Sequence, residues 1–184
     1  MNDLLRRRRA MMEKKTEYAP LYCFKDIKST DAGTNTGLVL FQDDKSFTIL
    51  TEYQAVRTAT HLTAWTPWRV NNNYRNEFAY NFWDTYTVGR RKYSYFKSGE
   101  AAYGTIRRIC QMYDSTTKRI KVYAHGYASF STTINEYVPS SDQLIIAKTD
   151  SGNSSLCTVR SFEYYDKVLP ERMIEDWLAE TPTE

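Results

Sequence analysis

The sequence predicts an all-β fold, an antiparallel sandwich with one short C-terminal helix and a basic N-terminal arm. Strand-favouring aromatic residues are plentiful, with 15 Tyr, 8 Phe and 4 Trp, whereas Gly is modest at 7. Short apolar segments alternate with polar turns from Pro20 onward. The chain of 184 residues is long enough to bury one sizeable core, and no internal repeat or long linker divides it.

The expected strands of the first half are short and bounded by turn residues. A first strand at residues 21–27 follows Pro20 and ends in a turn-rich stretch. Two further strands, 37–42 and 47–51, are joined by Asp43, Asp44 and Lys45. The sequence Asn71–Asn73 indicates an exposed loop, because Asn supports turns and left-handed backbone. Additional strands are expected at residues 59–65, 77–88 and 91–97.

The second half contains the clearest local signals. Two strands at residues 105–113 and 118–124 form a hairpin around a loop at 114–117. Later strands are punctuated by Gly126, Pro139 and Gly152. One helix is expected to begin at Pro170, since proline suits a first helical turn. Its apolar face, at three- and four-residue spacing, would comprise Met173, Ile174, Trp177 and Leu178.

Residues 1–19 form a separate arm, and residues 20–184 form one domain. Four apolar residues of the arm recur at intervals of seven, which places them on one stripe of a helix. An isolated helix of this length is marginal in water, and termini are poorly ordered unless tied down. A frayed, solvated tail is one interpretation, and docking on a neighbouring molecule is the preferred one. The expected docking contacts are Leu4, Leu5, Arg6, Arg7, Arg8, Arg9, Met11 and Met12.

The charge of the chain does not favour nucleic acid as a partner. The formal net charge is only +3. The arginine run could contact phosphate through counterion release, but it lacks interleaved aromatic residues for base stacking. An acidic or grooved protein surface is therefore the preferred target of the arm. No membrane partner is expected, because no apolar run approaches the roughly 18 residues that a span requires.

The cysteines do not indicate a disulfide framework or a metal site. Cys23, Cys110 and Cys157 are far apart and include no CxxC spacing. Together with His61 and His125 they supply too few ligands for zinc. We expect the thiols to act as small apolar side chains in a protein made in a reducing cytosol, and we expect no export signal.

The sequence does not predict an enzyme. Sandwich glucanases use closely spaced carboxylates of the Glu-x-Asp-x-x-Glu type, and this chain has no such triplet. Glu163 and Asp166 are three residues apart, which places them on opposite faces of a strand. Neither a Gly-x-Ser-x-Gly turn nor a phosphate-binding loop occurs. No cofactor and no metal are expected.

Sugar binding is the alternative function that the aromatic and amide residues indicate. Lectin sites combine an aromatic ring with Asn and Asp hydrogen-bond partners on nearby loops. The competing interpretation places the same aromatic residues in the core or at a subunit interface, where they are also enriched. The candidate glycan-binding residues are Trp65, Trp68, Asn72, Tyr74 and Trp83.

Two C-terminal stretches carry a resemblance to a known family. The run from Val122 to Gly126 is Val-Tyr-Ala-His-Gly, and residues 162–174 read Phe-Glu-Tyr-Tyr-Asp-Lys-Val-Leu-Pro-Glu-Arg-Met-Ile. Both resemble the closing strands of the concanavalin A-like or laminin-G-like jelly roll, and Phe47-Thr48-Ile49 looks like an early strand of that family. His125 stands where the family often has Asn. The resemblance implies a lectin-type jelly-roll sandwich, and these motifs carry no activity.

The leader, residues 1–15, is similar to short arms on virion proteins of tailed phages that infect gut Bacteroidales. This resemblance implies a non-enzymatic virion structural protein, a capsid decoration or a head or tail fibre component, anchored by its arm. It further implies a homotrimer bound to other virion proteins, made in the host cytoplasm and carried on the particle. The alternative is a lectin module that binds a host or mucus polysaccharide.

Overall fold

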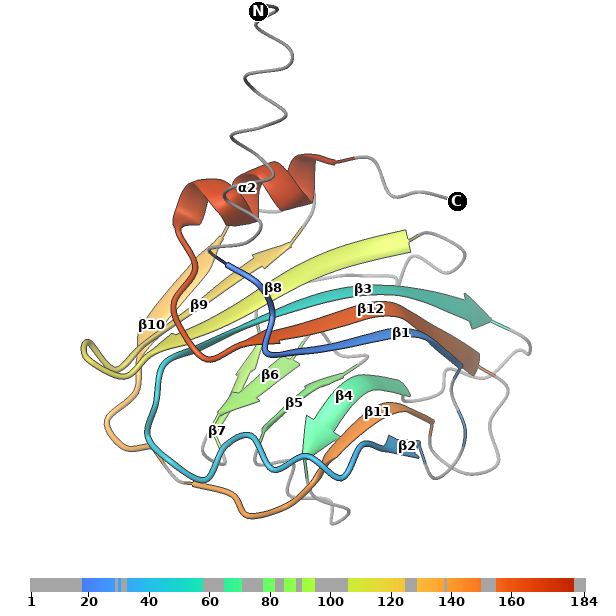
Figure 1. Ribbon diagram of the computed structural model, residues 1–184, viewed down its shortest axis with the longest axis horizontal. Coiled ribbons are helices and arrows are strands. Elements are labelled where there is room, and N and C mark those ends of the chain that lie inside the picture. Colours follow the sequence, from blue (N-terminus) through green and yellow to red (C-terminus); the bar gives the residue numbers. More distant parts are fainter. Residues whose placement is uncertain are drawn as a thin grey trace, which may run out of the picture.

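In the computed structural model the chain forms two antiparallel sheets packed face to face, with one helix outside them (Figure 1). Among the described residues each sheet has six strands. For β5, β6 and β7 the backbone alone is described. The structure describes residues 18–28, 30, 33–57, 65–70, 78–81, 85–88, 91–94, 106–124, 129–137, 139–149 and 155–180.

The first sheet lies next to the helix and contains the longest strands. In spatial order it comprises β1 (Tyr22–Lys28), β12 (Ser155–Tyr165), β3 (Phe47–Arg57), β8 (Ile106–Asp114), β9 (Arg119–Ala124) and β10 (Phe130–Thr133). The second sheet comprises β2 (Thr34–Asn35), β11 (Leu144–Thr149), β4 (Trp65–Val70), β5 (Phe78–Asn81), β6 (Thr85–Val88) and β7 (Arg91–Ser94). The helix is α2 (Glu171–Ala179).

Strand β3 shows why this sequence folds as a sandwich. Phe47, Ile49 and Tyr53 point into the core between the sheets. Leu50 points to the opposite face and packs beneath α2. Because successive strand residues face opposite sides, β3 supplies apolar side chains to two separate clusters. The all-β antiparallel fold with one C-terminal helix is therefore confirmed.

Strand β12 keeps its apolar residues inward through a β-bulge. Cys157 and Val159 face the core, and so do Phe162 and Tyr164, although the two pairs differ in sequence parity. The register against β3 shifts between Val159 and Ser161. The extra residue in the bulge corrects the parity, so that one face stays buried along the strand.

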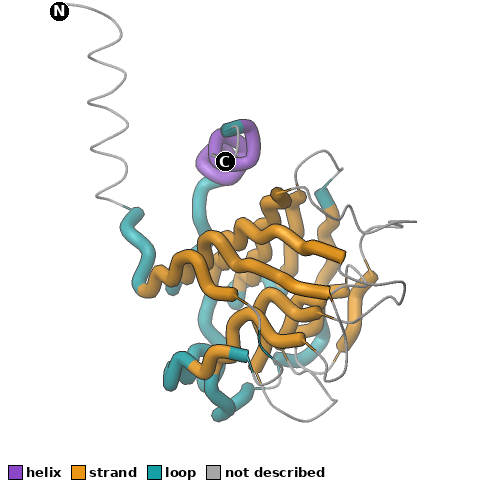
Figure 2. The backbone as a smooth tube through the Cα atoms, turned by 90° about the vertical axis from the view of Figure 1, so that its right-hand side faces the viewer, coloured by secondary structure: helices purple, strands orange, loops and turns teal. Residues whose placement is uncertain are grey.

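Helix α2 covers the outer face of the first sheet. Ile174 is fully buried, and Trp177 and Leu178 are partly buried against the same cluster. A quarter turn of the view shows the helix outside the strand layers (Figure 2). The apolar face expected from three- and four-residue spacing is confirmed, and the helix begins directly after Pro170.

The hairpin expected around residues 114–117 is also confirmed. Strand β8 pairs with β9 from Ile109↔Ala124 to Asp114↔Arg119. In the loop, Asp114 accepts hydrogen bonds from the backbone N–H of Thr116 at 2.9 Å and the hydroxyl of Thr117 at 2.8 Å. Such aspartate-centred turns are local, which is why sequence alone could place this one.

The strand expected at residues 37–42 is wrong. This segment is irregular and begins with Gly37, whose φ of +74° breaks extended structure. The carbonyls of Leu38 and Phe41 accept hydrogen bonds from Leu144 and Ser140 at 2.7 and 2.9 Å, so the backbone is satisfied without a strand of its own. Residues 77–88 contain two paired strands, β5 and β6, and the strand expected at 59–65 lies largely outside the described residues.

Trp68 occupies the centre of the core. Its side chain is 0% exposed and stacks against Phe41 and edge-on to Phe162, with ring centroids 6.1 and 6.2 Å away. The indole Nε1 donates a hydrogen bond to Oε1 of Gln111 in the opposite sheet at 2.9 Å. A buried indole requires such a partner, so this contact joins the two sheets at a defined point.

Removing this hydrogen bond should cost stability that a second substitution restores in part. Trp68→Phe is expected to lower the free energy of unfolding by about 2–4 kcal/mol, because it leaves a void and a buried acceptor without its donor. Adding Gln111→Leu should recover about 1–2 kcal/mol, since the orphaned acceptor is then absent. Urea-induced unfolding measures both values, and strictly additive losses would contradict the interaction.

Candidate functional site

Of the site residues predicted from the sequence, only Trp65 and Trp68 lie in the part of the chain that the structure describes. Trp68 as a glycan-binding residue is wrong, because its fully buried ring has no surface to offer a ligand. Trp65 begins β4 and pairs with Thr149, and its side chain is not described. The following predicted contacts lie outside the described residues: Asn72, Tyr74, Trp83, Leu4, Leu5, Arg6, Arg7, Arg8, Arg9, Met11 and Met12.

The described surface includes two hollows that β12 helps to line. The first, here called the edge hollow, has a volume of about 240 Å³ and lies where β1 begins and β12 ends. The irregular segment between Gly37 and Ser46 closes its other side. Its lining combines apolar and polar side chains, namely Leu21, Tyr22, Val39, Leu40, Gln42, Asp43, Lys45, Tyr164 and Asp166.

The edge hollow has an aromatic floor. The rings of Tyr22 and Tyr164 lie tilted with centroids 6.2 Å apart. Burial raises the pKa of Tyr164 to about 12, with Asp166 and Tyr22 adding to the rise, so its hydroxyl remains protonated. That hydroxyl donates to the carbonyl of Leu40 at 3.4 Å and links β12 to the irregular segment. Tyr22 is partly exposed and is the ring that a ligand could cover.

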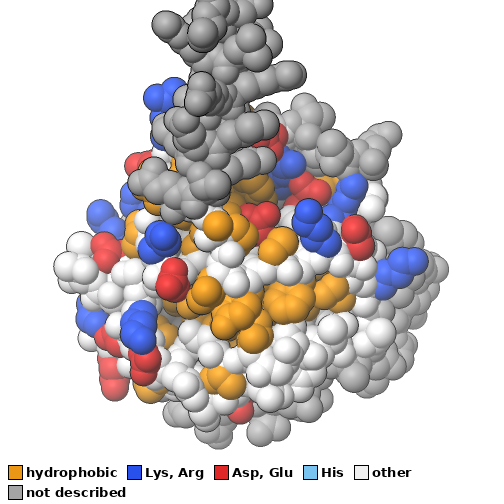
Figure 3. Space-filling model, in the orientation of Figure 1, with side chains coloured by type: hydrophobic (Ala, Val, Ile, Leu, Met, Phe, Trp, Pro, Cys, Tyr) orange, Lys and Arg blue, Asp and Glu red, His pale blue; other side chains and the backbone are white. Residues whose placement is uncertain are grey.

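Apolar side chains extend this floor outward. Leu21 is 54% exposed and Val39 is 36% exposed. Figure 3 shows a band of hydrophobic side chains across the face on which β1 lies, with acidic and basic side chains beside it. Because β1 is the outermost strand of its sheet, this band lies along an open edge of the sandwich.

The charged residues of the edge hollow do not cancel. Nζ of Lys45 lies 2.8 Å from Oδ2 of Asp43, and this hydrogen bond holds the pKa of Lys45 above its usual value. The second carboxylate, of Asp166, also acts on Lys45. Two carboxylates therefore share one ammonium group, and the hollow has an excess of negative charge.

The second hollow, here called the helix groove, has a volume of about 450 Å³ and lies between α2, the outer face of the first sheet and residues 18–20. Its floor is apolar and is formed by Leu50, Tyr165, Leu169, Met173 and Trp177. Its acidic lining residues are Glu163, Asp176 and Glu180. The hydroxyl of Tyr165 donates to Oε2 of Glu163 at 2.6 Å, which fixes that carboxylate at the groove.

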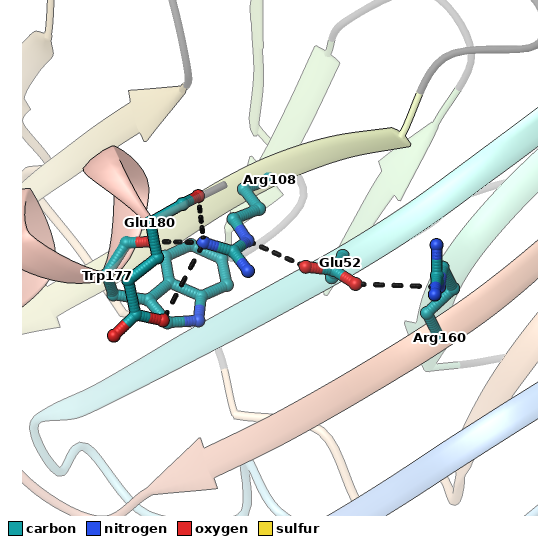
Figure 4. A network of polar contacts seen from close by, with 5 residues as sticks. All are labelled: Glu52, Arg108, Arg160, Trp177 and Glu180. Carbon is teal, nitrogen blue, oxygen red and sulfur yellow. Dashed lines mark hydrogen bonds and ion pairs between the residues drawn. The ribbon is translucent and has the colours of Figure 1, made fainter. Parts of the chain in front are cut away.

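Arg108 fastens the far end of α2 to the sheet (Figure 4). Its Nη1 donates to the backbone carbonyls of Trp177 and Glu180, each at 2.6 Å. Trp177 lies in the last turn of the helix, which has no basic residue of its own, and Glu180 is the residue that caps it. Arg108 thus satisfies acceptors that a helix end leaves open and places positive charge at the negative end of the helix dipole.

Arg108 is itself held by Glu52. Its Nε donates to Oε2 of Glu52 at 2.6 Å, and both side chains are about one-tenth exposed or less. Arg160 lies 3.6 Å from the other carboxylate oxygen, and the guanidinium of Arg108 lies 5.3 Å from the ring centre of Trp177. The network is structural, since it joins β3, β8, β12 and α2 and shapes one end of the helix groove.

Glu163 and Asp166 do not face each other across one site. Glu163 lines the helix groove whereas Asp166 lines the edge hollow, so this pair is divided between two surfaces. The side chain of Asp43 is 65% exposed and ion-paired, and Asp166 is exposed, so the two carboxylates in the edge hollow are suited to accepting hydrogen bonds.

Two of the three cysteines are buried. None of the three forms a disulfide. Burial raises the pKa of Cys157 to about 12 and raises that of Cys110 further. Within the described residues no group of His, Cys, Asp and Glu could hold a metal ion. The described part of the chain likewise contains no helix long and apolar enough to cross a membrane.

No family model and no curated protein matches this chain. Solved structures with the same fold do match. The carbohydrate-binding module CBM40 of the Ruminococcus gnavus IT-sialidase, bound to α2,3-sialyllactose, has a TM-score of 0.60 at 11% identity. The match covers 87% of this chain and 99% of that module.

Botulinum neurotoxin binding domains also match. The serotype G domain has a TM-score of 0.57 at 10% identity, covering 86% of this chain and 45% of that one. A type C structure, described as interacting with two ganglioside molecules, has a TM-score of 0.56 at 16% identity, covering 86% and 42%. The chain thus spans less than half of these toxin chains. At these identities the likeness shows the fold, a lectin-type sandwich whose neighbours are binding domains.

Loss of Arg108 should loosen the end of α2, and removing the Glu52 carboxylate as well should restore stability without restoring the helix end. Arg108→Met is expected to lower the free energy of unfolding by about 3–5 kcal/mol, because it leaves Glu52 buried with one distant partner. Adding Glu52→Met should recover much of this loss, measured by urea-induced unfolding. Amide hydrogen exchange in the last turn of α2 should be faster than in the wild type in both variants, because the carbonyls at this end of the helix have lost their donor. Exchange as slow as in the wild type, in either variant, would contradict the capping role.

Proposed function

We propose that this chain is a carbohydrate-binding module that holds one neutral sugar unit in the edge hollow and leaves it chemically unchanged. The observation that carries the proposal is the lining of that hollow, where a partly exposed tyrosine lies beside carboxylate, amide and ammonium groups. The fold supports it, since the R. gnavus carbohydrate-binding module matches over 99% of its length.

The chemistry of the hollow suits a sugar ring. One face of a pyranose is apolar and packs against an aromatic ring, for which Tyr22 is available. Ring hydroxyls both donate and accept, and the carboxylates of Asp43 and Asp166 accept while the ammonium of Lys45 donates. A volume of about 240 Å³ is below the roughly 300–1,000 Å³ of most small-molecule pockets, so a single ring fits better than a longer segment.

The charge of the hollow favours neutral sugars over acidic ones. Asp43 and Asp166 outnumber Lys45, so a ligand carboxylate would enter beside like charge. Juxtaposed like charges at a binding surface cost several kcal/mol. On this ground the ligand class differs from the sialyllactose bound to the R. gnavus module, although the fold is shared.

Attachment to a phage particle through residues 1–19, as a homotrimer bound to other virion proteins, stays a prediction of the sequence. The residues that would make the attachment lie outside the described part of the chain. A glycan-binding domain and a virion location are compatible, since a module displayed on a particle would meet polysaccharide at the host surface.

Tyr22→Ala should weaken sugar binding without unfolding the protein. The substitution removes an apolar contact worth about 1–2 kcal/mol, so the dissociation constant should rise roughly 5–30-fold. Calorimetric titration with the neutral glycan selected from an array measures this. Tyr18→Ala is the matched control, because it removes a partly buried tyrosine from the helix groove instead. Equal effects of the two substitutions would exclude the edge hollow.

Asp166→Asn should change which glycans bind. With one carboxylate removed, the charge that excludes acidic sugars falls, and the ratio of affinities for neutral over sialylated glycans should decrease by about tenfold. The comparison uses a matched pair of glycans that differ by one sialic acid. A wild-type preference for the sialylated member would contradict the assignment of a neutral ligand, whereas an array without any binding would contradict carbohydrate recognition itself.

A further inference from the structure

We propose that the helix groove is the docking site for residues 2–15 of a second copy of this chain. The groove is independent of the sugar site, since the two hollows share no lining residue. Leu50, Leu169 and Tyr165 form its floor, and each is at most 5% exposed. Its volume of about 450 Å³ holds side chains from one face of a helix, although not the helix itself, which is about 10 Å across.

The charged lining residues of the groove are acidic, and one of them, Glu180, lies 3.9 Å from Nη1 of Arg108. Glu163, Asp176 and Glu180 line it, and neither Lys nor Arg is among the described lining residues. The leader carries the opposite charge in four consecutive arginines, residues 6–9. Complementary charge steers association and fixes the register of the partner.

The apolar parts match as well. The sequence pattern of the leader places Leu4, Leu5, Met11 and Met12 on one stripe, with the arginines flanking it. Unbranched methionine side chains adapt to an irregular floor. A basic amphipathic segment is therefore suited to this groove in both apolar pattern and charge, as in the recognition of helices by hydrophobic grooves.

A second copy is a better source of this segment than the same chain. Tyr18, Ala19 and Pro20 already line the groove, so the chain's own leader starts at its wall. Only Thr16 and Glu17 separate residue 15 from Tyr18, so the chain's own leader would have to turn back within two residues to lie on the floor of the groove. The leader of another copy approaches without this constraint, and the resulting contact is heterologous, joining copies head to tail.

A charge exchange between two full-length variants tests the docking. The groove variant is Asp176→Lys, and this exposed residue lies near the end of α2, where a cation also suits the helix dipole. The leader variant carries Arg6→Glu, Arg7→Glu, Arg8→Glu and Arg9→Glu. Sedimentation velocity should show that the wild type self-associates and that either variant alone associates at least about tenfold more weakly.

Mixing the two variants should restore association between them, because the arginine leader of the Asp176→Lys variant then meets the unchanged acidic groove of the leader variant. Asp166→Lys is the matched control: it makes the same change in net charge at the edge hollow and should leave self-association unchanged. A wild type that stays monomeric at high concentration would overturn the proposal, including the case in which the leader binds its own groove. A mixture that stays dissociated, or an Asp166→Lys variant that loses association equally, would also overturn it.

Discussion

The hydrogen bond between Trp68 and Gln111 is the constraint on which the arrangement of the two sheets depends. It is formed between fully buried side chains, so neither partner can be lost without exposing a polar group to an apolar interior. The aromatic rings of Phe41 and Phe162 pack around the indole from segments far apart in sequence. Because this tryptophan belongs to the core, the proposed sugar binding must use another aromatic residue, and Tyr22 at the open sheet edge is available.

The outer face of the first sheet is organised by a second polar contact. Arg108 joins the buried carboxylate of Glu52 to the last carbonyls of α2, so the helix is fixed at the end where it lacks a basic residue. The helix in turn leaves space beside Leu50 and Leu169, which becomes the helix groove. A buried ion pair adds little net stability by itself, and its effect here is to fix the position of the helix.

Strand β12 connects the two candidate sites. Tyr164 faces the core side and contributes to the edge hollow, whereas Glu163 and Tyr165 face outward and line the helix groove. Alternation along one strand therefore supplies two surfaces of different chemistry, one suited to sugar hydroxyls and one to a basic amphipathic segment. The two surfaces share no lining residue, so a module could bind a glycan and a neighbouring copy at the same time.

The sequence by itself determined the fold class, the hairpin of β8 and β9, and the helix after Pro170, because these follow from local turn chemistry and residue periodicity. The tertiary structure decided that Trp68 is core, that residues 37–42 are irregular, and that a bulge in β12 turns Tyr164 inward. It also brought together Tyr22, Asp43 and Asp166, which are far apart in the chain. Which face of a strand is buried depends on partners distant in sequence, and one inserted residue reverses it, so local patterns could not reveal either hollow.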